Sequence, residues 1–439
     1  MNTKVLKFGG SSLADAAHFK KVGQIIREEK ERKYVVVSAP GKRHNKDEKV
    51  TDLLYQCYDL AVNNQDITPV FLKIEARYNE IIDGLSLKLS LAKEYLEIKN
   101  NIISTKSKDY AASRGEYLNG IILANYMGFT FVDPKDMILF NEDGILNPEG
   151  TDASICSALK AIEYAVIPGF YGSLPDGSIK TFSRGGSDVT GSMVAKAVKA
   201  SLYENWTDVS GVLMADPRIV KNPKVIETLT YKELRELSYM GTTVLHEDAT
   251  LPVRSEGIPI NIRNTNSPED KGTMIIPTYR FKNPNGIITG IAGKTGFTTI
   301  IIEKDMMNGE LGIGNKILEV LAKNSISFEH VPSSIDALSV IVNSKDLEEK
   351  EEFIIHQIIK AVKPDSIMIE DGLALVAVVG HNMVRAKGTA ARVFTAIAKA
   401  DINIKMIDQG ASELNIIVGV EEKDYKNTIK AIYNEFVNN

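Results

Sequence analysis

Lys4-Val5-Leu6-Lys7-Phe8-Gly9-Gly10-Ser11-Ser12 is the stretch of sequence that decides the fold of the first part of the chain. Its apolar residues predict a strand from Val5 to Phe8, and a helical pattern follows from Leu13 to about Lys33. A glycine turn between a strand and a helix lets main-chain N–H groups and the positive helix end approach an anion. Lys7 adds a full positive charge. The stretch therefore predicts a turn that binds a polyphosphate.

A second turn of the same kind lies far downstream, at Ser183-Arg184-Gly185-Gly186-Ser187-Asp188. It also precedes a helical pattern, and it adds a guanidinium and a carboxylate. Gly-Gly alone marks a tight turn more often than a ligand site. Two such turns that both carry charged side chains indicate phosphoryl transfer between two small anions.

Composition limits the class of protein. The chain has 439 residues, which is more than one hydrophobic core usually supports, so two or three domains are expected. Apolar residues make up 44% and charged residues 25%, as in ordinary globular proteins. The net charge is −5 and no block of basic residues occurs, which argues against nucleic-acid and membrane surfaces as partners.

The two cysteines, Cys57 and Cys156, lie far apart and without partners at metal-ligand spacing. We interpret them as buried thiols of a reducing compartment. The amino terminus has no secretory pattern, and no apolar run is long enough to cross a bilayer. A cytoplasmic location is therefore expected.

Strand and helix patterns alternate through the first 280 residues, which predicts an α/β sheet with helices on both faces. Several helices are expected between Val50 and Met127. The expected strands after the first are Tyr34–Ser38, Thr130–Val132, Ala165–Phe170, Ile179–Phe182 and Ile258–Arg263. Pro-Asn-Gly at 284–286 suits a linker, so we expect a first domain over 1–280 and a second over 281–439.

The second domain repeats a βαββαβ pattern. The first unit has strands at 297–303, 326–331, 337–342 and 366–370 and helices at 311–324 and 347–362. The second has strands at 374–379, 403–407 and 414–420 and helices at 389–400 and 423–436, and it lacks one strand. The strand expected at 287–292 could complete it. This predicts a module at about 296–370 inserted into a second module formed by 286–294 and 371–439.

These features together resemble the aspartate kinases of the amino acid kinase family, over nearly the whole chain. The motifs occur in the family's order: Lys7–Ser12, Val36-Val37-Ser38-Ala39, Gly115-Glu116, Gly169-Phe170, Ser183–Asp188, Thr207-Asp208-Val209-Ser210-Gly211, Asp216-Pro217-Arg218 and Val244-Leu245-His246. The resemblance implies a three-layer αβα sandwich followed by two ferredoxin-like ACT modules. It also implies transfer of a phosphoryl group from ATP to the side-chain carboxylate of L-aspartate, giving 4-phospho-L-aspartate on the way to lysine, threonine and methionine.

The fold alone does not identify the acceptor, because related kinases with similar sheets act on acetylglutamate, glutamate, carbamate or UMP. Residue chemistry favours a free amino acid. Arg184 can bind an α-carboxylate bidentately and Glu116 can accept an α-ammonium, which acetylglutamate and UMP lack. By motif position, Thr51, Phe170 and Ser187 complete this pocket. A carboxylate is already a nucleophile at neutral pH, so alignment and charge stabilisation are expected to supply catalysis.

The resemblance also assigns the nucleotide side. Lys7 would contact the transferring phosphate, Asp188 would organise Lys7 or a nucleotide-bound Mg²⁺, and the other contacts would come from Gly9, Gly10, Ser11, Thr207, Asp208 and Arg218. Two residues depart from the family's usual pattern. Leu213 stands where tyrosine is common and Thr243 where lysine is common, so we expect weaker ATP binding than in members that keep both.

The ACT modules carry no catalytic cluster and are expected to bind an amino-acid effector in a homodimer, with a tetramer left open. By motif position the effector site comprises Met307, Ile313, Ser327, Phe328, Glu329, Ser334 and Asp336. The two acidic residues favour lysine as a feedback inhibitor, with threonine as the alternative. Two rival functions remain: a kinase for another small carboxylate, and an amino-acid sensor that has lost nucleotide use.

Overall fold

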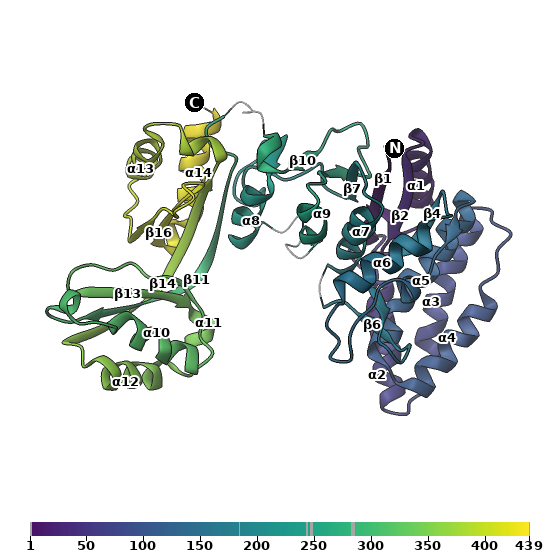
Figure 1. Cartoon of the computed structure of the whole chain (residues 1–439), viewed down its shortest axis with the longest axis horizontal. Helices are drawn as coiled ribbons and strands as arrows, with labels where there is room; N and C mark the ends of the chain where they lie inside the picture. Colours follow the sequence, from purple (N-terminus) through teal and green to yellow (C-terminus); the bar gives the residue numbers. More distant parts are fainter. Residues whose placement is uncertain (1, 184, 243–244, 246–248, 282–285, 439) are drawn as a thin grey trace. The chain divides into compact units, whose positions relative to one another are not determined.

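The computed structural model describes residues 2–183, 185–242, 245, 249–281 and 286–438, and these form two compact units (Figure 1). The first unit comprises Met1–Val212, Val225–Leu234 and Thr243–Lys282. The second comprises Leu213–Lys224, Arg235–Thr242 and Asn283–Asn439. Two short segments that precede residue 280 therefore group with the second unit, and a single domain boundary near residue 280 stays a prediction. No helix in the described part of the chain has the length and apolar character that crossing a bilayer requires.

The first unit is built on an eight-stranded sheet with the order β3-β4-β2-β1-β7-β9-β10-β8. Its strands are β1 (Lys4–Phe8), β2 (Arg32–Val37), β3 (Thr130–Phe131), β4 (Ala165–Pro168), β7 (Leu202–Thr207), β8 (Thr228–Thr230), β9 (Ile260–Asn264) and β10 (Thr273–Ile276). All neighbours are parallel except β9 and β10. A separate hairpin joins β5 (Tyr171–Ser173) and β6 (Ile179–Thr181). The predicted α/β sheet is confirmed.

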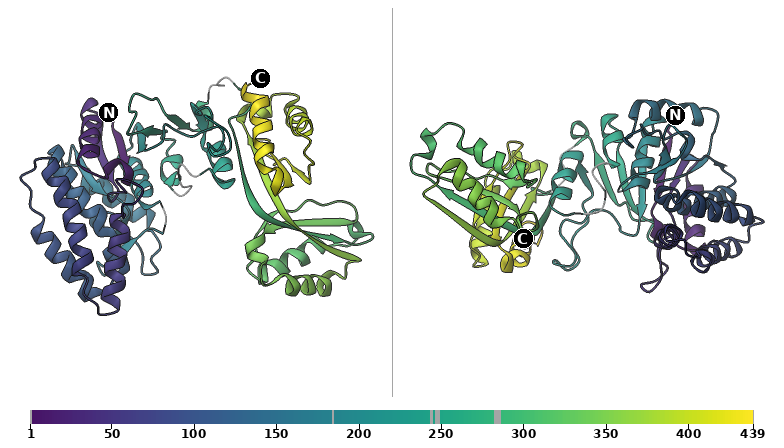
Figure 2. Two further views of the ribbon diagram at one scale, coloured as in Figure 1. Left: turned by 180° about the vertical axis from the view of Figure 1, so that it is seen from behind. Right: turned by 90° about the horizontal axis from the view of Figure 1, so that it is seen from below.

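Helices cover both faces of this sheet, as Figure 1 and Figure 2 show. The helices of the first unit are α1 (Ala16–Glu28), α2 (Val50–Val62), α3 (Thr68–Gly84), α4 (Ala92–Thr105), α5 (Lys108–Met127), α6 (Pro148–Leu159), α7 (Gly186–Ala197) and α9 (Leu251–Ser255), with shorter 3₁₀ turns η1 (Gly10–Leu13), η2 (Pro134–Asp136) and η4 (Thr278–Arg280). Helix α8 (Tyr231–Tyr239) begins in the first unit and ends in the second. Leu6 and Phe8 of β1 are buried in one core with side chains of α1 to α5. Because successive strand residues point to opposite faces, Lys7 faces the other side, toward α7.

The second unit holds a six-stranded antiparallel sheet with the order β12-β13-β11-β14-β16-β15. Its strands are β11 (Gly290–Glu303), β12 (Phe328–His330), β13 (Ala337–Asn343), β14 (Ser366–Val379), β15 (Met406–Asp408) and β16 (Asn415–Glu421). Its helices are α10 (Ile313–Lys323), α11 (Ser344–Leu347), α12 (Glu351–Val362), α13 (Thr389–Lys399) and α14 (Tyr425–Tyr433), with turns η5 (Met307–Gly309), η6 (His381–Val384), η7 (Glu422–Asp424) and η8 (Asn434–Asn438). Two separate hydrophobic cores lie under these helices.

The two modules share their central strands, which the sequence did not predict. Four short strands were expected, but β11 and β14 are each 14 residues long and pair with each other along their whole length (Figure 1). Both strands contain a glycine in the left-handed region, Gly296 at φ +89° and Gly372 at φ +75°. The glycines allow an irregular register at this point while the ladder continues, whereas in the sequence they look like strand ends.

The helix expected from Leu13 to about Lys33 was predicted too long. It spans Ala16–Glu28, with Asp15 as its N-cap, and Arg32 already begins β2. The Arg32 side chain is 2% exposed and pairs with Glu204 of β7. This buried ion pair requires the extended conformation at Arg32.

The expectation of two buried cysteines was wrong for one of them. Cys57 is buried, and burial raises the pKa of its thiol to about 12. Cys156 is exposed on α6. The buried side chains of α6 are Thr151, Ile155 and Leu159, which recur every four residues, and Cys156 falls beside that face.

Candidate functional site

Lys7 lies in the first unit as a nearly buried cation, paired with one carboxylate among the residues that the structure describes. Its side chain points from β1 to α7, where Nζ lies 2.6 Å from Asp188 Oδ1. Asn205 Nδ2 donates to the same oxygen at 2.8 Å. Asn205 stands beside Lys7 because β1 and β7 pair in parallel with these two residues in register. The structure therefore brings together two residues predicted 181 positions apart in the sequence.

The first glycine turn follows directly and is held at several points. Gly9 N donates to Trp206 O at 3.0 Å, and Gly41 N donates to Gly10 O at 2.8 Å. A Cβ atom on Gly10 would lie 2.7 Å from Ala39 O, so only glycine fits there. A Cβ on Gly9 would lie 3.7 Å from Lys7 Nζ, which places the turn beside the ammonium. Ser11 follows in η1.

The second glycine turn begins α7. Gly185 has φ +57° and caps the helix, whose first turn contains Ser187 and Asp188. A Cβ on Gly169 would lie 2.6 Å from Ser187 Cβ, so the chain after β4 packs directly on this turn. Phe170 follows with φ +81°, a strained conformation for an aromatic residue. Its N–H donates to Thr190 Oγ1 at 3.1 Å.

Arg184, the residue predicted to bind the substrate carboxylate, lies outside the described residues. Its role therefore stays a prediction.

Glu116 is a buried carboxyl group on α5, 6% exposed. Burial raises the pKa of Glu116 to about 8, although the N–H of Ala39 and the charges of Arg114 and Lys7 partly oppose this rise. Its Oε2 has no hydrogen-bond partner among the described residues. Buried acceptors are almost always satisfied, so this oxygen is suited to an incoming donor.

Thr51 lies in the first turn of α2 and is partly buried. A Cβ on Gly115 would lie 2.7 Å from Ala39 Cβ and 3.7 Å from Val50 Cγ1. The glycine before Glu116 therefore allows α5 to approach both the chain after β2 and the start of α2. This close approach brings the elements that carry Glu116 and Thr51 together.

The expected nucleotide residues are divided between the units. Thr207 ends β7, at the sheet edge where β1 leads into Gly9, and its Oγ1 donates to Asp208 Oδ1 at 3.3 Å. Leu213 and Arg218 belong to the second unit. Arg218 is paired with Asp216 through its Nη2, 2.6 Å from Oδ2.

The nucleotide roles of Leu213 and Arg218 stay predictions, and Thr243 lies outside the described residues. The carboxylate of Asp216 has its pKa lowered by the hydrogen bond from Arg218. Arg218 is therefore engaged by Asp216, although its side chain is 88% exposed.

Asn205 was not predicted from the sequence. The feature that could have pointed to Asn205 is a polar amide inside the strand Leu202–Thr207. It stands at the position that pairs with Lys7 once β1 and β7 are aligned. Asn119 was also missed. It is completely buried on α5 and donates to Ser38 O at 2.7 Å, which joins the helix of Glu116 to the end of β2.

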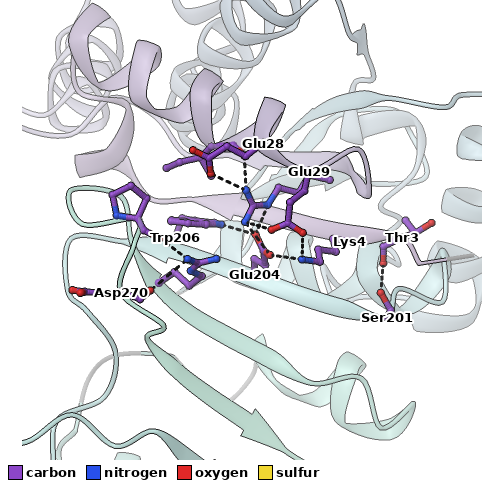
Figure 3. A network of polar contacts seen from close by, with 12 residues as sticks. Thr3, Lys4, Glu28, Glu29, Ser201, Glu204, Trp206 and Asp270 are labelled. Atoms are coloured by element: carbon purple, nitrogen blue, oxygen red, sulfur yellow. Dashed lines mark hydrogen bonds and ion pairs between the residues drawn. The ribbon is translucent and has the colours of Figure 1, made fainter.

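A second polar network supports the strands from the opposite face of the sheet (Figure 3). Glu204 of β7 is 1% exposed and accepts from Arg32 Nε at 3.0 Å and from Trp206 Nε1 at 2.9 Å. Lys4 Nζ reaches the same carboxylate at 3.3 Å. The network ties β1, β2 and β7 together, and so fixes the strand that carries Lys7.

In the second unit, the expected effector residues divide into two groups. Met307 and Ile313 are buried in the core of the first module. Phe328, Glu329 and the turn up to Asp336 lie on its surface, with Ser327 just before β12 and Ser334 in the turn. Glu329 accepts a hydrogen bond from Tyr239 Oη, and Asp336 Oδ1 accepts from Met306 N at 2.9 Å. The use of all seven residues by an effector stays a prediction.

Comparison with known proteins agrees with this architecture. Residues 2–264 match the amino acid kinase family and residues 376–436 match the ACT domain. Aspartokinase 3 of Bacillus subtilis (strain 168) is 39% identical, over 99% of this chain and 98% of its own length. The crystal structure of Clostridium acetobutylicum aspartate kinase, described as an allosteric enzyme, is 52% identical with a TM-score of 0.93, covering 99% of this chain and 100% of that one.

E. coli aspartokinase III, solved in complex with aspartate and ADP, shares the fold at 22% identity with a TM-score of 0.74, covering 99% of both chains. The predicted αβα sandwich followed by ferredoxin-like ACT modules is confirmed. The chain is an enzyme, a kinase that transfers phosphoryl groups. With its glycine turns, its Lys7–Asp188 pair and full-length similarity of this kind, the chain belongs to the aspartokinases of the amino acid kinase family.

Proposed function

We propose that the chain transfers the γ-phosphoryl group of ATP to the side-chain carboxylate of L-aspartate, giving 4-phospho-L-aspartate and ADP. The observation that carries this proposal is the Lys7–Asp188 pair at 2.6 Å between two glycine turns. The transition state of phosphoryl transfer is stabilised by a cation and N–H donors that are already in position before the reaction, and this arrangement offers both. The product would be the first intermediate on the way to lysine, threonine and methionine.

Glu116 and the turn at Gly185 would select aspartate. The unpaired Oε2 of Glu116 would accept the α-ammonium group, and Arg184 would bind the α-carboxylate. Thr51, Phe170 and Ser187 would line the remaining walls. A buried carboxylate that needs an ammonium partner discriminates against N-acylated analogues, because they would leave it unpaired.

Lys7 would then stabilise charge on the transferring phosphate, and the N–H groups of Gly10 and Ser11 would donate to its oxygens. The N–H of Gly9 already donates to Trp206 O, so Gly9 would contribute by letting the phosphate approach the turn closely. Asp188 would hold the Lys7 ammonium in place, with Asn205 fixing the carboxylate. Since the acceptor is already ionised, no side chain has to remove a proton from it. Holding the acceptor oxygen in line with the phosphorus is the main task of the pocket.

Mg²⁺ bound with ATP would supply positive charge that neutralises the phosphate groups. The donor set fits such an ion. Asp188 is a carboxylate beside the first glycine turn, and its carboxylate contacts with Lys7 and Asn205, the ones made with described residues, both involve Oδ1, so Oδ2 would be the oxygen offered to a metal. No cluster of three His, Cys, Asp or Glu side chains in the described residues could hold a metal by itself.

Thr207 would lie on the nucleotide side of the site, Asp208 would contact the ribose or base, and Arg218 a phosphate. Leu213 could pack against adenine, and Thr243 could donate a hydrogen bond but cannot replace a lysine. The substitution Thr243→Lys should lower the KM for ATP. An unchanged KM would count against a nucleotide role for this position.

The ACT modules would bind an amino-acid effector, with lysine preferred and threonine the alternative. Glu329 suits an ammonium group, and the exposed ring of Phe328 suits an alkyl chain. The outer strands β12 and β15 of the described sheet could each pair with a second copy, which supports a homodimer through these modules. Inhibition requires that the effector prefer a less active conformation.

Aspartate-dependent formation of ADP, measured with and without lysine, tests the proposal directly. A panel of glutamate, acetylglutamate and other small carboxylates should give far lower kcat/KM than aspartate. A hydroxamate assay would identify the acyl phosphate product. Turnover of another carboxylate in place of aspartate, or no turnover at all, would overturn the assignment.

A further inference from the structure

Arg114 carries a buried positive charge that no carboxylate neutralises directly in the described part of the chain. The residue lies on α5 and is 5% exposed. Its guanidinium donates to the neighbouring Ser113 Oγ, from Nε at 3.0 Å and from Nη2 at 2.9 Å. Burying a charge is costly unless other groups compensate it. A cation kept in this position therefore needs an explanation.

Three tyrosine rings surround this cation. Arg114 Cζ lies 4.7 Å from the ring centroid of Tyr110, 4.6 Å from Tyr117 and 5.0 Å from Tyr171. Tyr110 and Tyr117 belong to α5 itself, four residues before and three after Arg114, so they lie on the same helix face. Tyr171 comes from β5. The electron-rich ring faces stabilise the charge by cation–π attraction.

Tyr171 connects the group of three tyrosine rings around Arg114 to the proposed aspartate pocket. It directly follows Phe170, whose positive φ needs support from its surroundings. Its hydroxyl donates to Asp133 Oδ1 at 2.9 Å, so the ring is held between Arg114 and the chain after β3. Gly169, two residues earlier, packs on Ser187. The contact of Arg114 with Tyr171 therefore fixes one side of the proposed pocket.

Glu116 is the second connection, two residues after Arg114. The charged and titratable groups that act on Glu116 are Arg114 of α5, Lys7 of β1, Tyr55 of α2 and Tyr78 of α3. Burial raises the pKa of Glu116, and the positive charges of Arg114 and Lys7 oppose that rise. Since Lys7 is already paired with Asp188, Arg114 is the cation in this group without a carboxylate partner of its own.

We propose that Arg114 is a positioning residue of the aspartate pocket, whose cation, held against three tyrosine rings, fixes Tyr171 and the residues before it and adds positive charge to the surroundings of Glu116. It does not touch substrate and takes no part in the transfer. This inference rests on the proposed function, because it assigns Arg114 to the binding of the amino-acid acceptor. It implies that the positive charge at position 114 matters for aspartate and not for ATP.

The test compares Arg114→Met, which removes the charge, with Arg114→Lys, which keeps it. Arg114→Met should raise the KM for aspartate at pH 7 about tenfold, the equivalent of one pKa unit at Glu116. The KM should return toward that of the wild type as the pH rises, while kcat and the KM for ATP change by less than about twofold. Arg114→Lys should recover most of the affinity, because an ammonium also binds ring faces.

Arg27→Met is a matched control, because Arg27 also stacks on a tyrosine, Tyr126, at 4.9 Å, on α1 away from the pocket. It should leave both KM values unchanged. If Arg114→Met and Arg114→Lys lose aspartate affinity equally and at every pH, the role is only structural and the proposal is overturned. Unchanged affinity in Arg114→Met overturns it as well. Should Arg114→Met fail to fold, Arg114→Lys and Arg114→Gln carry the same comparison.

A readout without turnover separates this inference from the proposed function. Infrared difference spectra can follow the carboxyl band of Glu116 against pH, with Glu116→Gln as the blank. The titration should move to higher pH in Arg114→Met and stay near that of the wild type in Arg114→Lys. An unmoved titration overturns the inference. Absence of aspartate turnover in the wild type, in contrast, counts against the proposed function alone.

Discussion

Lys7 Nζ and Asp188 Oδ1 lie 2.6 Å apart, in a pair that closes the space between two glycine turns. Lys7 is 8% exposed, so the ammonium depends on this partner. Asp188 remains 19% exposed at its side chain, which leaves room for a ligand on the other oxygen. The pair holds the cation in place at the turn where we propose that phosphate binds.

Asp188→Asn should therefore reduce kcat more than it weakens aspartate binding. The amide keeps the shape but removes the charge that orients Lys7, and loss of one such electrostatic group costs about 10²–10³ in kcat. The KM for aspartate should change by less than about threefold, since Glu116 and Arg184 would hold the substrate. Steady-state kinetics at saturating Mg²⁺ measures both. A normal kcat in Asp188→Asn would contradict the role of the pair.

The stability of the same variants gives a second check. Asp188→Asn leaves Lys7 without its carboxylate and should lower the free energy of unfolding by about 1–3 kcal/mol. Lys7→Met in the Asp188→Asn background should recover part of this loss, because it removes the unpaired charge. A double-mutant cycle in denaturant quantifies the coupling. Additive losses would show that the two groups do not stabilise each other.

Aspartate binding should depend on pH through Glu116. Burial raises the pKa of Glu116 to about 8, so the free enzyme at pH 7 holds the group mainly as the neutral acid. Binding of an ammonium requires the carboxylate. We expect kcat/KM for aspartate to rise about tenfold per pH unit below pH 8 and to level off above it.

Glu116→Gln should abolish this part of the pH profile and raise the KM for aspartate at pH 8.5. It should also change the pH dependence of stability. The folded-state pKa of Glu116 lies above the ordinary value of 4.5, so between these two values the folded state binds a proton that the unfolded state has lost. The contribution of Glu116 to the free energy of unfolding is therefore fully present below pH 4.5. That stability is lost as the pH rises toward 8, and the variant should lose less over the same window. Identical profiles for both proteins would contradict a protonated Glu116.

The sequence predicted the first strand and the glycine turn after it well, because a strand followed by two glycines restricts the backbone locally, while the binding of phosphate by this turn stays a prediction. It could not predict Asn205, whose importance depends on the register of β1 and β7. It also divided β11 and β14 at Gly296 and Gly372, since a glycine that lets a strand bend looks like a strand end. Contacts between distant segments, such as Tyr239 with Glu329, leave no local pattern.

Gly10→Ala should damage ATP binding because its Cβ would lie 2.7 Å from Ala39 O, closer than real contacts allow. The turn must shift, and we expect a loss of about 1–3 kcal/mol in stability. The KM for ATP should rise about tenfold if the shift costs one N–H contact to phosphate. Gly314→Ala is the control, since its Cβ meets nothing closer than 3.8 Å within α10. If both variants bind ATP equally well, the turn does not bind phosphate.

Inhibition by lysine should depend on Tyr239, because its hydroxyl is hydrogen-bonded to Glu329, a predicted effector-binding residue. The Tyr239 hydroxyl donates to the Glu329 carboxylate, and both groups belong to the second unit. An effector ammonium that binds Glu329 has to share the carboxylate with the Tyr239 hydroxyl or displace that hydroxyl. Tyr239→Phe removes the competitor, so lysine should inhibit at a concentration about two- to fivefold lower, a modest effect for a half-exposed contact.

Glu329→Gln should act in the opposite direction, because an amide cannot neutralise an ammonium group. The half-inhibitory lysine concentration should rise at least tenfold, while activity without lysine stays near that of the wild type. Threonine tested in parallel separates the two effectors, since its α-ammonium could use Glu329 but its side chain cannot. If Glu329→Gln leaves lysine inhibition intact and Tyr239→Phe weakens it, the hydroxyl rather than the carboxylate serves the effector, and the site has to be sought elsewhere on the module.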